Sequence, residues 1–186
     1  MTYGSPNDEA PRNSPAVRIV TGPRDSGKTA WAVEYARTHP VRGLVSEKRF
    51  RENRLEGYDL LILPNGPGLP LAREAASPRR SAETVRPGWF SFRRFEFNQA
   101  AFDRAVVEAR SAVDAAARGA VDPAGRAVFV VDEVGPLEVE GAGFRPLFDL
   151  ILPSSLEIIL TARPELIGWV RALVLDRPVE LIRLSA

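Results

Sequence analysis

The stretch that decides the fold is Val17-Arg18-Ile19-Val20-Thr21-Gly22-Pro23-Arg24-Asp25-Ser26-Gly27-Lys28-Thr29. Residues 22–29 fit the pattern G-x-x-x-x-G-K-[ST] without a mismatch. A short apolar strand is expected over 17–20, and a helix over 29–38, which His39-Pro40 ends. The order strand, loop, helix predicts a loop that binds phosphate groups.

Each position of this loop has a physical task. Gly22 and Gly27 let the backbone turn so that N–H groups surround a phosphate, and the helix adds its positive N-terminal end. Lys28 is predicted to contact the β- and γ-phosphates of a nucleoside triphosphate and to act in catalysis, while the Thr29 hydroxyl binds Mg²⁺. The residues between the glycines complete the predicted nucleotide contacts: Pro23, Arg24, Asp25 and Ser26.

Asp25 is the unusual residue of the loop, because a glycine is common at that place. Asp tolerates a positive φ better than most residues do. Its charge would repel phosphates if the side chain faced inward. We therefore expect the Asp25 carboxylate to face solvent.

A second candidate site follows another apolar strand, in which Val128-Phe129-Val130-Val131 leads to Asp132 and Glu133. A strand buried on both faces is expected to end in charge only where it opens into a site. Asp132 is predicted to hold Mg²⁺. Glu133 points the other way if the strand alternates strictly, which favours a role as general base on the attacking water. Glu138 either assists this site or lies at the surface.

A third strand end carries Thr161 and Arg163. Thr161 either contacts the γ-phosphate or the attacking water, or it only makes a hydrogen bond at the end of the strand. Arg163 either stabilises charge or contacts the base, or it is a surface residue at the start of a helix. Both are kept as candidate nucleotide-binding residues.

The remaining pattern predicts an α/β fold of three layers. Strands are expected at 41–45, 58–63, 89–97, 127–131, 156–160 and 179–184, and helices at 98–118, 144–152 and 164–175. Continuous apolar strands that alternate with helices indicate a mostly parallel sheet covered on both faces, with ligands at the carboxyl ends of the strands. The region 41–97 is expected to add antiparallel strands at one edge, with charged turns over 46–57 and a long irregular loop over 64–87.

The composition excludes several classes of protein. The chain has 25 basic and 24 acidic residues, for a net charge of +1, so it carries no strong nucleic-acid signal. It has no Cys and one His, which excludes disulfides and Cys- or His-rich metal sites. No apolar run approaches the ~20 residues of a membrane span, and the N-terminus lacks the apolar stretch of a signal peptide. We expect a cytoplasmic protein, with a disordered tail over 1–16 and one domain over 17–186.

Two basic features are assigned lesser roles. Only Lys28 and Lys48 are lysines among the 25 basic residues. Lys48 begins a basic stretch, 48–54, for which a solvated hairpin edge is favoured over contact with a nucleotide or nucleic acid. Arg73, within the predicted irregular loop, is a weaker candidate for an arginine finger.

Together these motifs resemble the THEP-type, or cancer-related, nucleoside-triphosphatases. The resemblance rests on the loop 22–29, the block Asp-Glu-x-Gly-Pro-x-Glu over 132–138 and the Thr-Ala-Arg strand end over 161–163, with looser agreement at 43–47, 57–60, 71–73 and 88–90. It implies a RecA-like P-loop fold and slow, Mg²⁺-dependent hydrolysis of several nucleoside triphosphates. Asp25 and Ala30 depart from the family pattern, and the N-terminal tail lies outside it.

Two alternatives to a hydrolase stay open. A small-molecule or nucleotide kinase would share the fold, although the sequence shows no acceptor site. A nucleotide-gated binding module would use hydrolysis to time its contact with a protein partner, which the sequence does not identify. No Asn-Lys-x-Asp tetrad is present, so strict specificity for guanine is not expected.

Overall fold

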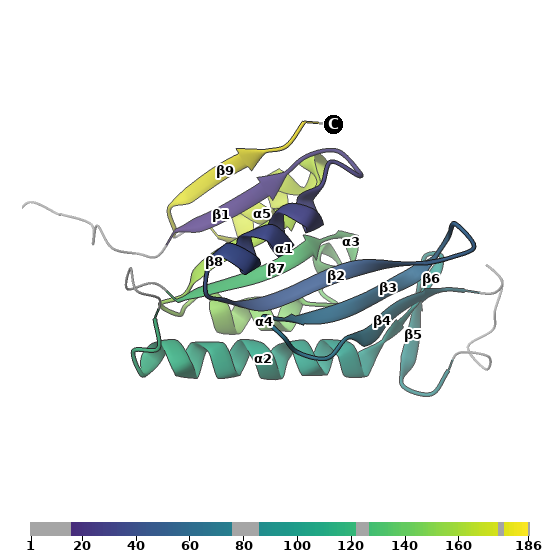
Figure 1. Cartoon of the computed structure of the whole chain (residues 1–186), viewed down its shortest axis with the longest axis horizontal. Helices are drawn as coiled ribbons and strands as arrows, with labels where there is room; N and C mark the ends of the chain where they lie inside the picture. The colour runs from purple at the N-terminus through teal and green to yellow at the C-terminus, as the bar shows by residue number, and fades with distance from the viewer. Residues whose placement is uncertain (1–15, 76–85, 122–126, 175–176, 186) are drawn as a thin grey trace, which may run out of the picture.

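The computed structural model describes residues 16–75, 86–121, 127–174 and 177–185. Its elements in chain order are β1 (Val17–Thr21), α1 (Lys28–Thr38), β2 (Val41–Arg51), β3 (Arg54–Leu63), β4 (Leu69–Glu74), β5 (Trp89–Phe92), β6 (Phe95–Asn98), α2 (Gln99–Ala117), β7 (Val128–Val134), α3 (Pro136–Val139), α4 (Arg145–Ile151), β8 (Glu157–Ala162), the 3₁₀ turn η2 (Pro164–Leu166), α5 (Ile167–Leu173) and β9 (Val179–Arg183). One sheet contains the nine strands in the order β5-β6-β4-β3-β2-β7-β8-β1-β9 (Figure 1).

The parallel half of the sheet brings the predicted motifs together. β1 pairs in parallel with β8 and β9, and β7 pairs in parallel with β8 and β2. β8 therefore lies between the strand that leads into the phosphate loop and the strand that ends in the two acids. The predicted RecA-like arrangement of parallel strands is confirmed, but the sheet as a whole is mixed, because its other four pairings are antiparallel. All three motifs lie at the carboxyl ends of the parallel strands.

The antiparallel edge is also confirmed, but three of its predicted segments are wrong. The single strand expected over 89–97 is a hairpin of β5 and β6, because the chain turns at Arg93, where φ is 54°. Residues 46–57 are not charged turns, because β2 and β3 continue through them as a hairpin whose turn residues, Glu52 and Asn53, have positive φ. Their charged side chains project from a two-stranded edge instead of a buried sheet, so the apolar pattern of a strand is missing. The predicted loop 64–87 contains β4, while residues 76–85 lie outside the described part.

Two hydrophobic cores make the three layers. α1 covers one face, where Ala32 packs with Val20, Val130 and Ile159. α2, α4 and α5 cover the other, against a core that includes Ile19, Phe129 and Leu160. Figure 1 shows α1 on the face opposite to α2 and α4. Successive residues of β1, β7 and β8 alternate between the two cores, so the buried parallel strands need apolar residues on both sides.

The helix boundaries mostly follow the predicted signals. The Asn98 side chain accepts a hydrogen bond from Ala100 N at 3.2 Å and so caps α2, and Gly119 beyond its end has φ 80°. The predicted helix 164–175 begins as the turn η2 and ends at Leu173. No helix in the described ranges is long and apolar enough to cross a membrane. Of the predicted tail, only Ala16 is described.

Candidate active site

The phosphate loop is shaped by its two glycines. A Cβ on Gly22 would lie 2.5 Å from Ser26 Oγ and 2.7 Å from the carbonyl oxygen of Leu184, so no larger residue fits without a shift of the backbone. Gly27 adopts the left-handed conformation, with φ 84° and ψ 15°, directly before α1 begins. A side chain on Gly27 would have room, but its backbone conformation would be strained.

Lys28 folds back over this loop. Its ammonium donates hydrogen bonds to the carbonyl oxygens of Gly22 at 2.8 Å and Pro23 at 2.6 Å. Burial lowers the pKa of Lys28, and the nearby charge of Glu133 opposes that shift. The ammonium thus lies at the mouth of the loop and inside the electric field of the acidic strand end.

Asp132 is the centre of a hydrogen-bonded network. Thr29 Oγ1 donates to its Oδ2 at 2.8 Å, and Thr161 Oγ1 donates to its Oδ1 at 2.6 Å. The backbone N–H of Ser46 also donates to Oδ2, at 3.2 Å. The residue is 1% exposed. Burial raises the pKa of Asp132, whereas the hydrogen bond from Thr161 and then that from Thr29 act to lower it.

Glu133 does not continue the strand regularly. Its φ is 63°, and the pairing of β7 with β8 shifts register between Val131 and Val134. The expectation that strict alternation directs its side chain is therefore wrong, because a bulge sets the direction instead. Its N–H donates to Thr161 Oγ1 at 2.7 Å, which helps to hold this unfavourable backbone conformation.

The Glu133 carboxylate faces a cleft of about 710 Å³ that Lys28, Thr29, Asp132, Thr161 and Arg163 also line. Arg163 Nη2 lies 3.5 Å from Glu133 Oε1. Burial, and then the charge of Asp132, raise the pKa of Glu133, whereas the charge of Arg163 lowers it. The cleft thus joins residues from three strand ends that lie far apart in the sequence.

For Thr161 and Arg163, the structure excludes the simpler of the two alternatives. Thr161 is buried and its hydroxyl connects Asp132 to the backbone of Glu133, so it holds both acids in addition to lining the cleft. Arg163 is not merely a surface charge, because it pairs with Glu133. Contact of either residue with a nucleotide remains a prediction.

Asp25 faces solvent as expected, with its side chain 62% exposed and φ 63°. Arg24 Nε lies 3.8 Å from its carboxylate. The sequence does not reveal its main partner, Lys48, whose ammonium donates a hydrogen bond to Asp25 Oδ1 and which also lines the cleft. That hydrogen bond lowers the pKa of Asp25. Lys48 therefore contacts the phosphate loop, and the prediction that it lies only on a solvated hairpin edge is wrong for this residue.

Two other candidates lie in places that the sequence did not indicate. Glu138 does not lie at the surface: it is buried, and its carboxylate accepts hydrogen bonds from the N–H groups of Gly135 at 2.8 Å and Phe144 at 3.0 Å. That it assists the site stays a prediction. Burial raises the pKa of Glu138 to about 7. Arg73 cannot act as an arginine finger in this arrangement, because it pairs with Asp59 and donates to the carbonyl oxygen of Tyr58 at 2.7 Å.

Sequence reasoning also missed Ser46 and Tyr58. Ser46 lies on β2, next to β7, and Tyr58 lies on β3 and lines the cleft. The Ser46 contact uses a backbone N–H, which every residue except proline carries, so its side chain gives no signal. Tyr58 falls in a predicted strand, but only the pairing of β3 with β2 brings it near Glu133.

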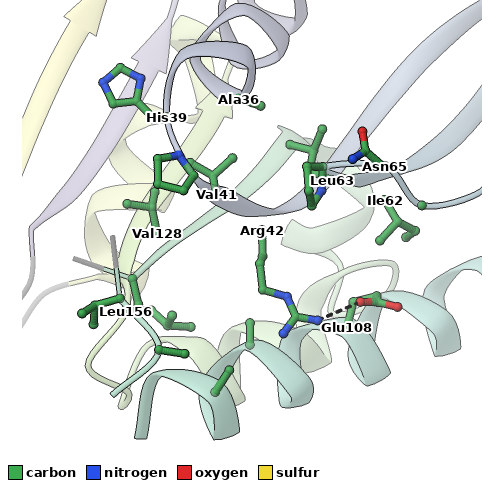
Figure 2. Close-up of a pocket in the computed structure, with 18 of the residues that line it drawn as sticks. Ala36, His39, Val41, Arg42, Ile62, Leu63, Asn65, Glu108, Val128 and Leu156 are labelled. Carbon is green, nitrogen blue, oxygen red and sulfur yellow. Dashed lines mark hydrogen bonds and ion pairs between the residues drawn. The ribbon is translucent and has the colours of Figure 1, made fainter. Parts of the chain in front are cut away.

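A larger cavity, of about 1010 Å³, lies at the opposite end of the parallel strands. Its lining includes His39 and the first residues of β2 and β7, Val41 and Val128 (Figure 2). An ion pair of 3.4 Å joins Arg42 and Glu108 across it. None of the predicted site residues lines this cavity, and ligands of such sheets bind at the carboxyl ends of the strands. The cleft at Lys28 is therefore the candidate active site.

The oxygen atoms at the cleft fit Mg²⁺. Thr29 Oγ1 and Asp132 Oδ2 are 2.8 Å apart, and both are hard oxygen donors. Within the described ranges, no three His, Asp or Glu side chains form a cluster that would enclose a metal. Mg²⁺ needs no such cluster when it keeps water molecules and binds substrate phosphates with only one or two protein ligands.

Comparison with known proteins agrees with this geometry. The model of a family described as NTPase matches residues 18–186. The chain belongs to this NTPase family. Membership assigns nucleoside-triphosphatase activity to the chain, as the resemblance of its motifs implies. A search among curated proteins gives no significant match.

Two solved structures share the fold. The solution structure of a human cancer-related nucleoside triphosphatase is 22% identical, with a TM-score of 0.65 over 90% of this chain and 88% of that chain. The crystal structure of THEP1 from the hyperthermophile Aquifex aeolicus is 17% identical, with a TM-score of 0.64 over 91% of this chain and 90% of that chain. The P-loop NTPase fold of three layers is thus shown.

Proposed function

We propose that this NTPase hydrolyses several nucleoside triphosphates to diphosphate and phosphate in a reaction that depends on Mg²⁺. One observation carries the proposal: Thr29, Thr161 and Ser46 converge on Asp132, while Glu133 next to it faces the same cleft as Lys28. P-loop NTPases use an acid beside the phosphate loop for the metal and a second residue that positions the attacking water, and Asp132 and Glu133 suit these two tasks.

Each residue receives a role from its position. The loop 22–29 binds the triphosphate, with the Lys28 ammonium on the β- and γ-phosphates. Thr29 and Asp132 would hold Mg²⁺, which would supply positive charge beside the phosphates. Glu133 accepts the proton of the attacking water, because its raised pKa brings it closer to neutral pH. Arg163 limits that rise and orients the carboxylate, and Thr161 holds both acids in place.

We further propose slow turnover with little discrimination between bases. The sequence lacks the Asn-Lys-x-Asp tetrad of guanine-specific enzymes, and the family resemblance implies several substrates. A cytoplasmic location and the division into a tail and one domain stay predictions.

The direct test measures phosphate release from ATP, GTP, CTP and UTP, with Mg²⁺ and with EDTA. Glu133→Gln should keep nucleotide binding and lower the rate about 10²- to 10⁴-fold, the usual contribution of a general base. Glu47→Gln is the matched control, because Glu47 is an exposed carboxylate that lines the same cleft. Hydrolysis at the wild-type rate by Glu133→Gln, or loss of the rate by Glu47→Gln as well, would contradict the assigned base.

A further inference from the structure

A second pocket, of about 380 Å³, opens beside the proposed catalytic cleft. Both cavities are lined by Arg24, Tyr58, Glu133 and Arg163. A molecule in the second pocket would therefore lie against the same glutamate that faces the phosphate loop. Its volume lies at the lower end of the range for small-molecule sites, which suits a compound of one to three rings.

The wall of this pocket is aromatic. Phe92, Phe95 and Phe97 come from the β5–β6 hairpin, and Phe102 and Phe144 complete the cluster behind them. The Phe97 and Phe102 ring centroids are 6.0 Å apart, and those of Phe102 and Phe144 are 5.0 Å apart. The three hairpin rings are only partly buried, so they leave ring surface free to face a ligand. Hydrolysis by a water molecule does not use an aromatic surface, whereas a bound organic ring can pack against one.

Arg93 and Arg94 add positive charge to this wall at the turn of the hairpin. Their guanidinium carbons lie 5.3 Å and 5.0 Å from the ring centroids of Phe92 and Phe95. Both are exposed, and neither forms an ion pair within the described part of the chain. The two acids of the pocket are already engaged, since Glu133 pairs with Arg163 and Glu138 accepts backbone N–H groups. The charge left unpaired on the lining is therefore positive.

We propose that this aromatic pocket binds a planar aromatic compound that carries one acidic group, a carboxylate, sulfonate or phosphate. The rings pack against Phe92, Phe95 and Phe97, and the acidic group contacts Arg93 and Arg94. The end of the compound nearest the cleft displaces water from Glu133. The proposal that the pocket binds this compound depends only on the pocket. The expectation that the bound compound slows hydrolysis rests on the proposed function.

The probe for binding is 8-anilinonaphthalene-1-sulfonate, whose fluorescence rises in an apolar site. N-phenyl-1-naphthylamine has the same rings without the sulfonate and serves as the uncharged comparison. We expect saturable binding of the sulfonate to one site of the wild-type protein. Phe92→Ala should raise its Kd at least about ten-fold, as expected when a ring contact is lost.

The charge is tested by the double variant Arg93→Gln/Arg94→Gln, which should weaken binding of the sulfonate about ten-fold and leave the uncharged compound unaffected. Phe50→Ala and Arg51→Gln are the matched controls, because both residues are exposed on β2 and neither lines the pocket. Thermal unfolding verifies that each variant is folded, and the arginine variant keeps the test valid if Phe92→Ala is not. Unchanged binding in the arginine variant, or equal loss in the controls, would overturn the proposal.

Hydrolysis separates the two claims. The sulfonate should slow phosphate release by the wild-type protein and have about ten-fold less effect on Phe92→Ala at the same concentration. Lys28→Ala should lose hydrolysis and still bind the sulfonate with the wild-type Kd. If that variant hydrolyses normally, the proposed function fails while the pocket stands. If the sulfonate binds without slowing wild-type hydrolysis, the contact with Glu133 is refuted.

Discussion

The substitution Thr161→Val tests the hydrogen-bond network under the two acids. It keeps the size and branching of the side chain and removes the hydroxyl that donates to Asp132 at 2.6 Å and accepts from Glu133 N at 2.7 Å. A hydrogen bond to a charged group contributes ~1.5–3 kcal/mol and a neutral one ~0.5–1.5 kcal/mol. We expect the free energy of unfolding to fall by about 2–4 kcal/mol.

Thr21→Val is the matched control on the adjacent strand. Thr21 is also buried, and its Oγ1 has no hydrogen-bond partner in the described part of the chain. Replacing an unpartnered buried hydroxyl by a methyl group should leave stability unchanged or raise it by about 1 kcal/mol. The two substitutions make the same chemical change, but only Thr161→Val is expected to lower stability.

Urea unfolding followed by Trp fluorescence measures both values, and Thr161→Ser should recover most of the loss because it restores the hydroxyl. Phosphate release against pH gives a second readout. The hydrogen bond from Thr161 lowers the pKa of Asp132, so its removal should move the acidic limb of the profile to higher pH. Equal stability of Thr161→Val and Thr21→Val, with an unmoved profile, would refute the role given to Thr161.

Three further predictions concern charge. Glu138 has a pKa of about 7 in the fold against an ordinary value of 4.5, so the native state binds more protons and stability falls as pH rises from about 4.5 to 7. Glu138→Gln should reduce the loss of stability between pH 5 and 8, measured by urea unfolding, by about 2–3 kcal/mol. An equal loss of stability in both proteins would contradict this. Lys48→Gln should weaken nucleotide binding, measured by titration calorimetry, about two- to five-fold, because it leaves the Asp25 carboxylate without its partner beside the phosphates. The weakening should be smaller in an Asp25→Gly background, and equal weakening in both backgrounds would contradict this reason. Asp132→Asn should remove the extra thermal stabilisation that Mg²⁺ gives with saturating nucleotide; a Mg²⁺-dependent shift as large as in the wild type would count against Asp132 as ligand.

The predictable part of the fold consists of its buried parallel strands and the loops that follow them. Residues 17–29 and 128–133 have apolar runs that end in residues of distinctive chemistry, so the strand, the loop and the site share one signal. The hairpin over 46–57 has no such signal, because its charged side chains do not enter a core. In the β5–β6 hairpin, aromatic and polar residues alternate through 89–97, so the sequence pattern does not reveal the turn at Arg93.

The contacts that could not be predicted are those between segments distant in the chain. Lys48 reaches Asp25, and the N–H of Ser46 reaches Asp132 across 86 positions of sequence. Glu138 could not be placed, because its partners are backbone N–H groups, which carry no residue-specific pattern. Local patterning therefore located the chemistry, and tertiary pairing determined which neighbours complete it.

The strand β2 connects the candidate active site to the outer end of the β2–β3 hairpin. Within a few residues it contacts Asp132 through Ser46 and the phosphate loop through Lys48. Phe50, one residue before the end of the strand, is 58% exposed. Because a strand rises ~3.3 Å per residue, the Cα atom of Phe50 lies only ~13 Å along the strand from that of Ser46. The inner part of the hairpin is thus held by two hydrogen bonds, one to the Asp132 carboxylate and one to the phosphate loop, while its outer end presents an exposed aromatic ring a short distance away.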